Sequence, residues 1–190
     1  MPFDFRATEI DGLMIIQPRV YPDARGFFME TFKESEFAAA GIDLPFVQDN
    51  FSRSSRGVVR GLHFQTPPHS QGKLVRCVRG AVWDVAVDLR KGSATFGQWH
   101  GEELSEENKT LYYLPPGFAH GFVVLSESAD FFYKVTAEYA PDHDGGIRWN
   151  DPDLAVGWPI DPTEAAVSTK DAELPLFADL PLMKQGGMEV

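Results

Sequence analysis

Residues 57–65, Gly-Val-Val-Arg-Gly-Leu-His-Phe-Gln, have the composition of a buried strand that carries two costly polar groups. Their β-branched and aromatic side chains favour pleated, buried backbone. Arg60 and His63 interrupt the run, and neither is buried cheaply without a partner. Strict alternation puts these two on opposite faces, whereas a bulge at Gly61 would break that parity. On the strand alone, His63 is more simply a core histidine than a proton-transfer group.

Short apolar stretches separated by glycine and proline run through most of the chain. Residues 81–89 show the period of two most clearly, with Asp84 and Asp88 on one set of alternating positions and Trp83 on the other. Such a pattern predicts an all-β sandwich or barrel. The expected strands are residues 13–20, 27–32, 47–52, 57–65, 73–79, 81–89, 97–104, 109–114, 120–127 and 130–139.

Only two short helices are expected beside these strands. Glu34–Ala40 is acidic at its start and is followed by Gly41, a common residue after a helix end. Ser168, followed three residues later by Asp171, resembles a capping box. Gly80, between two predicted strands, predicts a hairpin.

Length and composition predict one globular domain over residues 1–190, with a frayed tail at 184–190. The chain contains no run of 18 apolar residues, so no membrane span is expected, and the N-terminus lacks the order of a signal peptide. The single cysteine, Cys77, excludes an internal disulfide and fits a cytoplasmic protein.

The charge is unevenly distributed along the chain. The net charge of −11 argues against non-specific nucleic-acid binding. Residues 53–91, however, hold eight basic and two acidic side chains, whereas the remainder holds nine basic and 26 acidic ones. The basic segment is either an anion site, as for a phosphate, or a set of solvated strand ends paired with the acidic remainder.

A second informative stretch is residues 114–122, Leu-Pro-Pro-Gly-Phe-Ala-His-Gly-Phe. Its prolines and glycine force a turn that leads His120 into a strand. The spacing Pro115-x-Gly117-x-x-His120 is similar to the second motif of cupin barrels. Metal-binding cupins also carry His-x-His, but Phe64 and Gln65 follow His63 here. Two histidines without further ligands favour a metal-free cupin.

A set of ordered landmarks makes the chain resemble the dTDP-4-dehydrorhamnose 3,5-epimerases, jelly-roll cupins that epimerise deoxysugar nucleotides. The resemblance covers about Gly12 to Asp171. Each landmark alone is weak, whereas their common order is specific. The landmarks are residues 23–28 (DARGFF), 47–50 (VQDN), 59–65 (VRGLHFQ), 71–76 (QGKLVR), 83–88 (WDVAVD), 95–99 (TFGQW), 116–122 (PGFAHGF), 132–134 (FYK), 146–151 (GIRWND) and 168–171 (STKD).

The resemblance implies roles for four catalytic side chains. His63 is the implied base, and Asp171 is the partner that fixes its tautomer and stabilises the imidazolium. Tyr133 is the implied acid on the opposite face of the sugar, and Lys73 stabilises the enolate oxygen. Taken without the resemblance, Asp171 is a helix N-terminal acid and Tyr133 a wall of the core.

The resemblance also implies a substrate-binding set without metal or hydride carrier. Arg60 is the implied diphosphate ligand, and Gln48 and Asn50 offer amides for a pyrimidine edge. Two departures from the family stand at Asp144, often Glu, and at Glu138, often Tyr. The implied substrate-binding residues are Arg25, Glu30, Gln48, Asn50, Arg60, Lys73, His120, Asp144 and Lys170.

The implied function is conversion of dTDP-4-keto-6-deoxy-D-glucose to dTDP-4-dehydro-L-rhamnose for cell-surface polysaccharide such as lipopolysaccharide. The implied assembly is a homodimer with exchanged strands. An epimerase acting at carbon 3 only, a non-catalytic nucleotide-sugar-binding cupin and a metal cupin are the alternatives. Retention of His63, Tyr133, Lys73 and Asp171 together speaks against the non-catalytic one.

Overall fold

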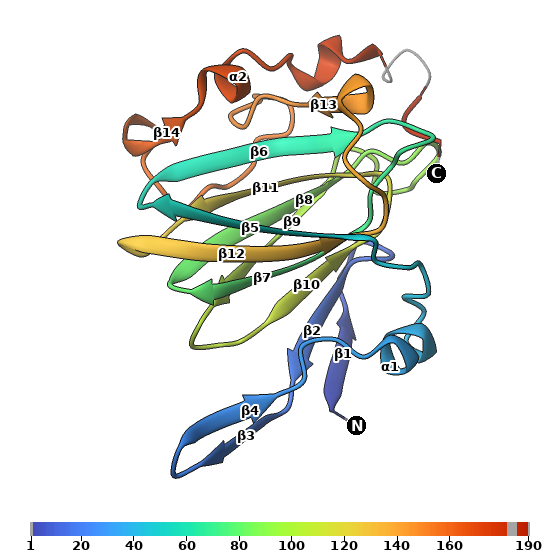
Figure 1. The fold of residues 1–190 in the computed structure, drawn as a ribbon. Helices are drawn as coiled ribbons and strands as arrows, with labels where there is room; N and C mark the ends of the chain where they lie inside the picture. The colour runs from blue at the N-terminus through green and yellow to red at the C-terminus, as the bar shows by residue number, and fades with distance from the viewer. Residues whose placement is uncertain (1, 182–185, 190) are drawn as a thin grey trace.

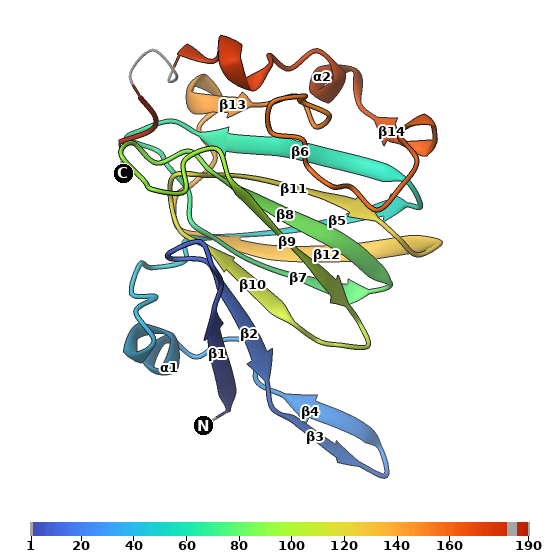
Figure 2. The ribbon, with the colours of Figure 1, turned by 180° about the vertical axis from the view of Figure 1, so that it is seen from behind.

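The computed structural model describes residues 2–181 and 186–189, which form two packed antiparallel sheets and a projecting hairpin (Figures 1 and 2). The first sheet has the order β1 (Phe3–Ala7), β2 (Met14–Pro18), β10 (Leu111–Leu114), β7 (Lys73–Arg79), β12 (Ser128–Val135) and β5 (Gln48–Ser55). The second has the order β13 (Asp144–Gly146), β6 (Val58–Gln65), β11 (Phe118–Val124), β8 (Ala81–Asp88) and β9 (Trp99–Ser105), and β14 (Ala166–Val167) pairs with β6 in parallel. The hairpin consists of β3 (Val20–Asp23) and β4 (Gly26–Met29).

This arrangement is the jelly-roll barrel that the strand pattern and the cupin resemblance predict. The chain repeatedly passes from one sheet to the other, and Gly80 is one such crossing point. The predicted Gly80 hairpin is wrong, because β7 pairs with β10 and β12 while β8 pairs with β9 and β11. Gly80 has a φ of +75° and lies at a corner between the sheets. A local turn signal does not distinguish a hairpin from such a corner.

The main core lies between the two sheets. Alternate residues of β8 face opposite sides, so Val82 and Ala86 pack inside the barrel while Val85 and Val87 pack on its outer side. The inward cluster also takes Val75, Phe131 and Tyr112 from the first sheet, with other residues of both sheets. One strand thus serves two cores because side chains alternate across a sheet.

Short helices and loops cover parts of the outer faces. The helix α1 (Glu34–Ala39) places Phe37 against Phe3, with ring centroids 5.1 Å apart in an edge-to-face arrangement. The C-terminal segments cover the second sheet, where Phe177 packs beside Val85 and Val87. They include the helix α2 (Thr169–Ala172) and the 3₁₀ turns η1 (Pro141–His143), η2 (Pro162–Glu164) and η3 (Phe177–Asp179).

Both helix predictions are confirmed, but the C-terminal part of the chain is more ordered than expected. Residues 184, 185 and 190 of the predicted frayed tail lie outside the described residues. The described residues 186–189 pack against the barrel, where Met188 is buried and exchanges backbone hydrogen bonds with Leu89 and Lys91. Residues 144–146, expected to be loop, pair with β6 as β13.

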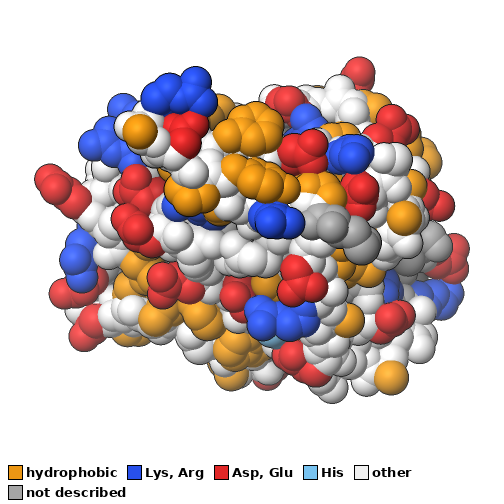
Figure 3. Space-filling view, turned by 90° about the horizontal axis from the view of Figure 1, so that it is seen from below, with side chains coloured by type: hydrophobic (Ala, Val, Ile, Leu, Met, Phe, Trp, Pro, Cys, Tyr) orange, Lys and Arg blue, Asp and Glu red, His pale blue; other side chains and the backbone are white. Residues whose placement is uncertain are grey.

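One face of the first sheet stays open beside α1. It presents Phe51, which is 61% exposed, and the projecting hairpin presents Phe27 and Phe28 at 59% and 66%. Figure 3 shows hydrophobic side chains gathered on this lower side of the molecule, with acidic and basic ones between them. No helix among residues 2–181 and 186–189 has the length and hydropathy of a membrane span.

Candidate active site

A cavity of about 430 Å³ opens between the two sheets at one end of the barrel. It lies where β5, β12 and β7 of the first sheet face β6 and β11 of the second. Nine of the twelve residues predicted for the site line this cavity, which are Gln48, Asn50, Arg60, His63, Lys73, His120, Tyr133, Asp144 and Lys170. The structure therefore gathers residues from across some 120 positions of the chain into one pocket.

A bulge in β6 brings Arg60 and His63 to the same pocket. In the ladder with β11, His63 pairs with His120 and Arg60 pairs with Phe122, so two residues of β6 lie opposite one residue of β11. The parity break considered for Gly61 therefore occurs. Gly61 has a φ of +132°, and a Cβ there would stand 2.5 Å from the Gly121 Cα. The close approach of the two strands requires glycine at this position.

His63 and Asp171 form a hydrogen-bonded pair at the edge of the pocket. The His63 Nε2 lies 2.8 Å from the Asp171 Oδ1, and the other carboxylate oxygen accepts the Gly61 N–H at 3.3 Å. Burial alone would raise the Asp171 pKa, but the hydrogen bond and charge of His63 outweigh it and hold that pKa below its ordinary value. Asp171 also lies in the first turn of α2, where the Ser168 hydroxyl accepts its backbone N–H at 3.1 Å. Asp171 therefore both contacts His63 and lies in the first turn of a helix.

Tyr133 faces this pair from the opposite sheet. It lies on β12, packs against Phe131 with centroids 6.0 Å apart, and lines the cavity. Burial raises the Tyr133 pKa, with a smaller opposing effect from the Arg60 charge. The phenol is therefore protonated at neutral pH and has a proton to give.

Lys73 lies at the buried end of the cavity, only 7% exposed. Its Nζ donates to the Gln71 Oε1 at 3.3 Å, and the Gln71 amide donates to the Ala137 carbonyl at 2.7 Å. Burial lowers the Lys73 pKa to about 8, although the charges of Asp144 and Asp84 oppose this. Gln71 was not predicted as a site residue, although it opens the landmark at residues 71–76 and stands two positions before Lys73.

His120 also lines the cavity, and it is held from behind by Asp84. The His120 Nε2 lies 3.0 and 2.9 Å from the two oxygens of the Asp84 carboxylate, which is fully buried. The ring stacks on Phe131 at an interplanar angle of 19°. Asp84 was missed as a site residue, although an acid between the apolar Val82 and Ala86 on one strand face was a usable signal.

Polar side chains surround the mouth of the cavity. Gln48 and Asn50 are hydrogen-bonded to each other at 2.9 Å, and the Gln48 Oε1 accepts the Tyr139 N–H at 3.0 Å. The Lys170 Nζ donates to Asp144 at 2.5 Å. Arg60 donates from Nε to the Ser54 hydroxyl at 3.0 Å, and this is its one side-chain hydrogen bond within residues 2–181 and 186–189.

Two departures from the family pattern fall at this mouth. Asp144 still lines the cavity despite its shorter side chain, and it lies 3.4 Å from the Tyr139 hydroxyl. Glu138 is exposed and does not line the cavity, whereas Tyr139 does. The substitution at 138 therefore lies outside the pocket wall.

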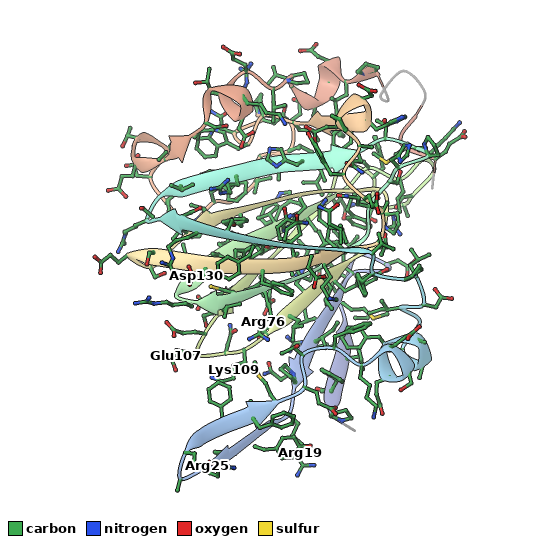
Figure 4. The ribbon with its side chains drawn as sticks, in the orientation of Figure 1. Arg19, Arg25, Arg76, Glu107, Lys109 and Asp130 are labelled. Carbon is green, nitrogen blue, oxygen red and sulfur yellow. The ribbon has the colours of Figure 1, made fainter. Side chains whose placement is uncertain are left out.

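Arg25 and Glu30 are not brought to the cavity of their own chain. Arg25 lies on the projecting hairpin, where its side chain is 90% exposed and paired with Asp23 at 2.6 Å. Figure 4 shows Arg25 and Arg19 at the hairpin, away from the barrel strands that hold Arg76 and Asp130. The predicted site is thus incomplete in one chain, with nine residues lining the pocket and Asp171 behind His63.

Comparison with known proteins agrees with this geometry. The profile of the dTDP-4-dehydrorhamnose 3,5-epimerase family matches residues 7–179. The enzyme of that name from Pseudomonas aeruginosa is 54% identical over 171 residues, covering 90% of this chain and 93% of the relative. The one from Methanothermobacter thermautotrophicus is 52% identical over 170 residues, covering 89% and 91%.

A solved structure shares the whole fold. The Legionella pneumophila dTDP-6-deoxy-D-glucose-3,5-epimerase, crystallised with dTDP-4-keto-L-rhamnose, superposes with a TM-score of 0.93 at 47% identity and covers 99% of this chain and 98% of its own. Match length, identity and fold agree, and the chain belongs to the dTDP-4-dehydrorhamnose 3,5-epimerase family.

Proposed function

We propose that this protein epimerises dTDP-4-keto-6-deoxy-D-glucose at carbons 5 and 3 to give dTDP-4-dehydro-L-rhamnose. The observation that carries the proposal is the placement of three groups around one cavity. His63 lies on the second sheet with Asp171 of α2 beside it, whereas Tyr133 and the buried Lys73 lie on neighbouring strands of the first sheet. Inversion beside a ketone needs a base on one face, an acid on the other and a cation at the carbonyl oxygen.

The first step is removal of the proton on carbon 5. The His63 Nε2 is engaged by Asp171, so Nδ1 is the nitrogen left to accept the carbon-bound proton. The electron pair of the C–H bond moves toward the carbonyl, and the oxygen on carbon 4 becomes an enolate. Asp171 stabilises the imidazolium that forms.

The second step returns a proton from the other face. The Tyr133 hydroxyl gives its proton to carbon 5, the enolate collapses to the ketone, and carbon 5 is inverted. Solvent then protonates the tyrosinate and removes the proton from His63. The same cycle at carbon 3 completes the double epimerisation, with side chains moving the carbon-bound protons and solvent restoring their protonation states.

Lys73 supplies the positive charge beside the enolate oxygen. In a buried pocket this charge acts more strongly than in water and is already in place when the reaction begins. Arg60 and Lys170 are positioned for the diphosphate, and the linked amides of Gln48 and Asn50 for the base.

The test is incubation with dTDP-4-keto-6-deoxy-D-glucose in deuterated water, followed by NMR at each carbon. We expect deuterium at carbons 3 and 5 and the L-configured product. Exchange at carbon 3 alone indicates the single-carbon epimerase, and ligand binding without exchange indicates a non-catalytic cupin.

We also propose that the working form is a homodimer. The exposed Phe51 on the first sheet and Phe27 and Phe28 on the hairpin offer an apolar surface for a second copy. Arg76 on the same sheet face has a buried Nε without a partner among the described residues. In such a dimer the hairpin carries Arg25 and Glu30 to the cavity of the partner subunit.

We propose further that the chain is a single domain and that it works in the cytoplasm. Both sheets and the C-terminal segment contribute to one pocket, which supports a single domain over residues 1–190. Cys77 is buried and unpaired, and burial raises its pKa to about 12. An inert free thiol fits a protein that works in the reducing cytoplasm.

A further inference from the structure

Asp84 is a carboxylate in the apolar interior of the barrel, where burying a charge costs free energy. Its side chain is fully buried on β8, in line with Val82 and Ala86 of the main core cluster. The imidazole of His120 is its one side-chain hydrogen-bond partner among the described residues. Burial raises the Asp84 pKa, against the opposing effects of His120 and Lys73. A buried ion held by a single partner is poor evidence for a stabilising role.

Asp88, four residues further along the same strand, shows what a structural carboxylate looks like in this protein. It is buried to the same extent, yet its oxygens accept hydrogen bonds from the Arg90 guanidinium and backbone and from the hydroxyls of Ser93 and Thr95. None of these partners of Asp88 lines the cavity, whereas His120, the partner of Asp84, does. Asp84 and Asp88 are therefore equally buried but differ in the number and kind of their hydrogen-bond partners.

The contact of Asp84 is directed at the reaction centre. Both carboxylate oxygens engage the His120 Nε2, so the proton of a neutral His120 is held on that nitrogen. The Nδ1 is then the nitrogen left for the sugar, on a ring that lines the cavity and lies opposite His63 in the β6–β11 ladder.

Asp84 also acts on Lys73 through its charge. The titratable and charged groups that line the cavity with Lys73 include Asp144, His120, His63 and Tyr133, and Asp84 lies behind His120. Only the two acids favour the ammonium form of Lys73, and Asp144 is already paired with Lys170. Asp84 is therefore the negative charge inside the barrel that is not shared with another lysine.

We infer that Asp84 is a positioning residue for the epimerisation, which orients His120 with Nδ1 toward the sugar and keeps Lys73 cationic beside the enolate oxygen. The inference rests on the proposed function and deepens it. Asp84 itself touches neither the cavity nor the sugar.

Two variants separate its two roles. Asp84→Asn keeps an acceptor for His120 and removes the charge, whereas Asp84→Leu removes both at similar volume. For Asp84→Asn we expect kcat to fall about tenfold with KM within about threefold, and the alkaline limb of kcat/KM to move at least about half a pH unit downward. For Asp84→Leu we expect a larger loss of kcat and loss of the fixed His120 tautomer in ¹⁵N NMR, with thermal stability equal to the wild type or higher.

Asp88→Asn is the matched control, because it neutralises an equally buried carboxylate outside the site. It should lower thermal stability and leave the alkaline limb in place. If both Asp84 variants keep the wild-type kcat and pH profile, the inference is overturned. Should Asp84→Leu fail to fold, Asp84→Asn alone decides.

A readout without substrate distinguishes this inference from the proposed function. The ¹³Cε signal of Lys73 should titrate at lower pH in Asp84→Asn than in the wild type. If the wild type shows no deuterium exchange, the proposed function fails, while the titration still reports on Asp84. An unchanged Lys73 midpoint rejects the charge role regardless of activity.

Discussion

The Nε2 of His63 lies 2.8 Å from a carboxylate oxygen of Asp171, a residue 108 positions further along the chain. This contact joins β6 of the barrel to the first turn of α2, and it leaves Nδ1 as the nitrogen that can work on the sugar.

Replacing His63 with Asn should abolish deuterium exchange at both carbons, because the proposed base is removed. We expect kcat to fall by at least about 10³-fold. His69→Asn is the control, since His69 is exposed and does not line the cavity. Exchange that persists in the His63 variant at either carbon shows that another group is the base.

Tyr133→Phe should separate proton removal from inversion. His63 can still take the proton, but no phenol delivers one from the opposite face, so inverted product should fall far more than proton abstraction does. The measurement compares deuterium incorporation with product configuration by NMR. Tyr113→Phe, at a buried tyrosine on the outer side of the first sheet, should behave as wild type. Normal inversion in the Tyr133 variant would assign the acid elsewhere.

Lys73→Met should lower kcat by about 10²- to 10³-fold, because the enolate oxygen loses its cation. In the wild type, kcat/KM should fall as pH rises through about 8, the pKa that burial gives Lys73, since the ammonium is lost above it. The alkaline limb should disappear in the Met variant. A limb that stays near the same pH in Lys73→Met belongs to a different group.

Asp88→Asn should destabilise the fold without affecting the reaction. Burial raises the Asp88 pKa, but the donors from Arg90, Ser93 and Thr95 outweigh it and leave the pKa below its ordinary value. A depressed folded-state pKa contributes stability above the unfolded value, and this is lost as pH falls through the folded one. We expect a loss of about 3 kcal/mol at pH 7, or about 6–12 °C in Tm, that shrinks below about pH 4. A Tm difference independent of pH would contradict this account.

Mixing two inactive variants tests the exchanged hairpin. If Arg25 serves the cavity of the partner subunit, a mixture of Arg25→Ala and His63→Asn refolded together should form heterodimers with one intact site. Activity should then recover to about a quarter of the wild-type value for random pairing of the two chains. Phe51→Asp on the exposed sheet face should weaken the dimer in size-exclusion chromatography and abolish this recovery. No recovery in a mixture that does form heterodimers places Arg25 in its own subunit's site or outside any site.

Local signals in the sequence were enough for most of the barrel strands, the capped helix at Ser168 and the apolar character of β6, whereas β1, β13 and β14 were not expected. Strand composition and the period of two are properties of neighbouring residues, so they can be recognised without knowledge of the fold. The ordered landmarks also brought the site residues into view, and the structure places nine of them in one cavity.

Pairing between distant segments decided the bulge in β6, the corner at Gly80 and the partner of Asp84. The bulge opposite Gly121, which turns Arg60 and His63 to the same side, depends on how β6 meets β11. The corner at Gly80 depends on which sheet each flanking strand joins. The contact of Asp84 with the His120 ring depends on how β8 pairs with β11.

At His63, local sequence and tertiary structure each decided part of the result. The sequence by itself determined a histidine in a buried strand, and on that strand alone a core role was the simpler interpretation. Tertiary structure decided its partner, its free nitrogen and the phenol on the facing sheet, because these contacts join residues that are remote along the chain. Local propensity acts over a few residues, whereas catalytic geometry is set by the packing of the two sheets.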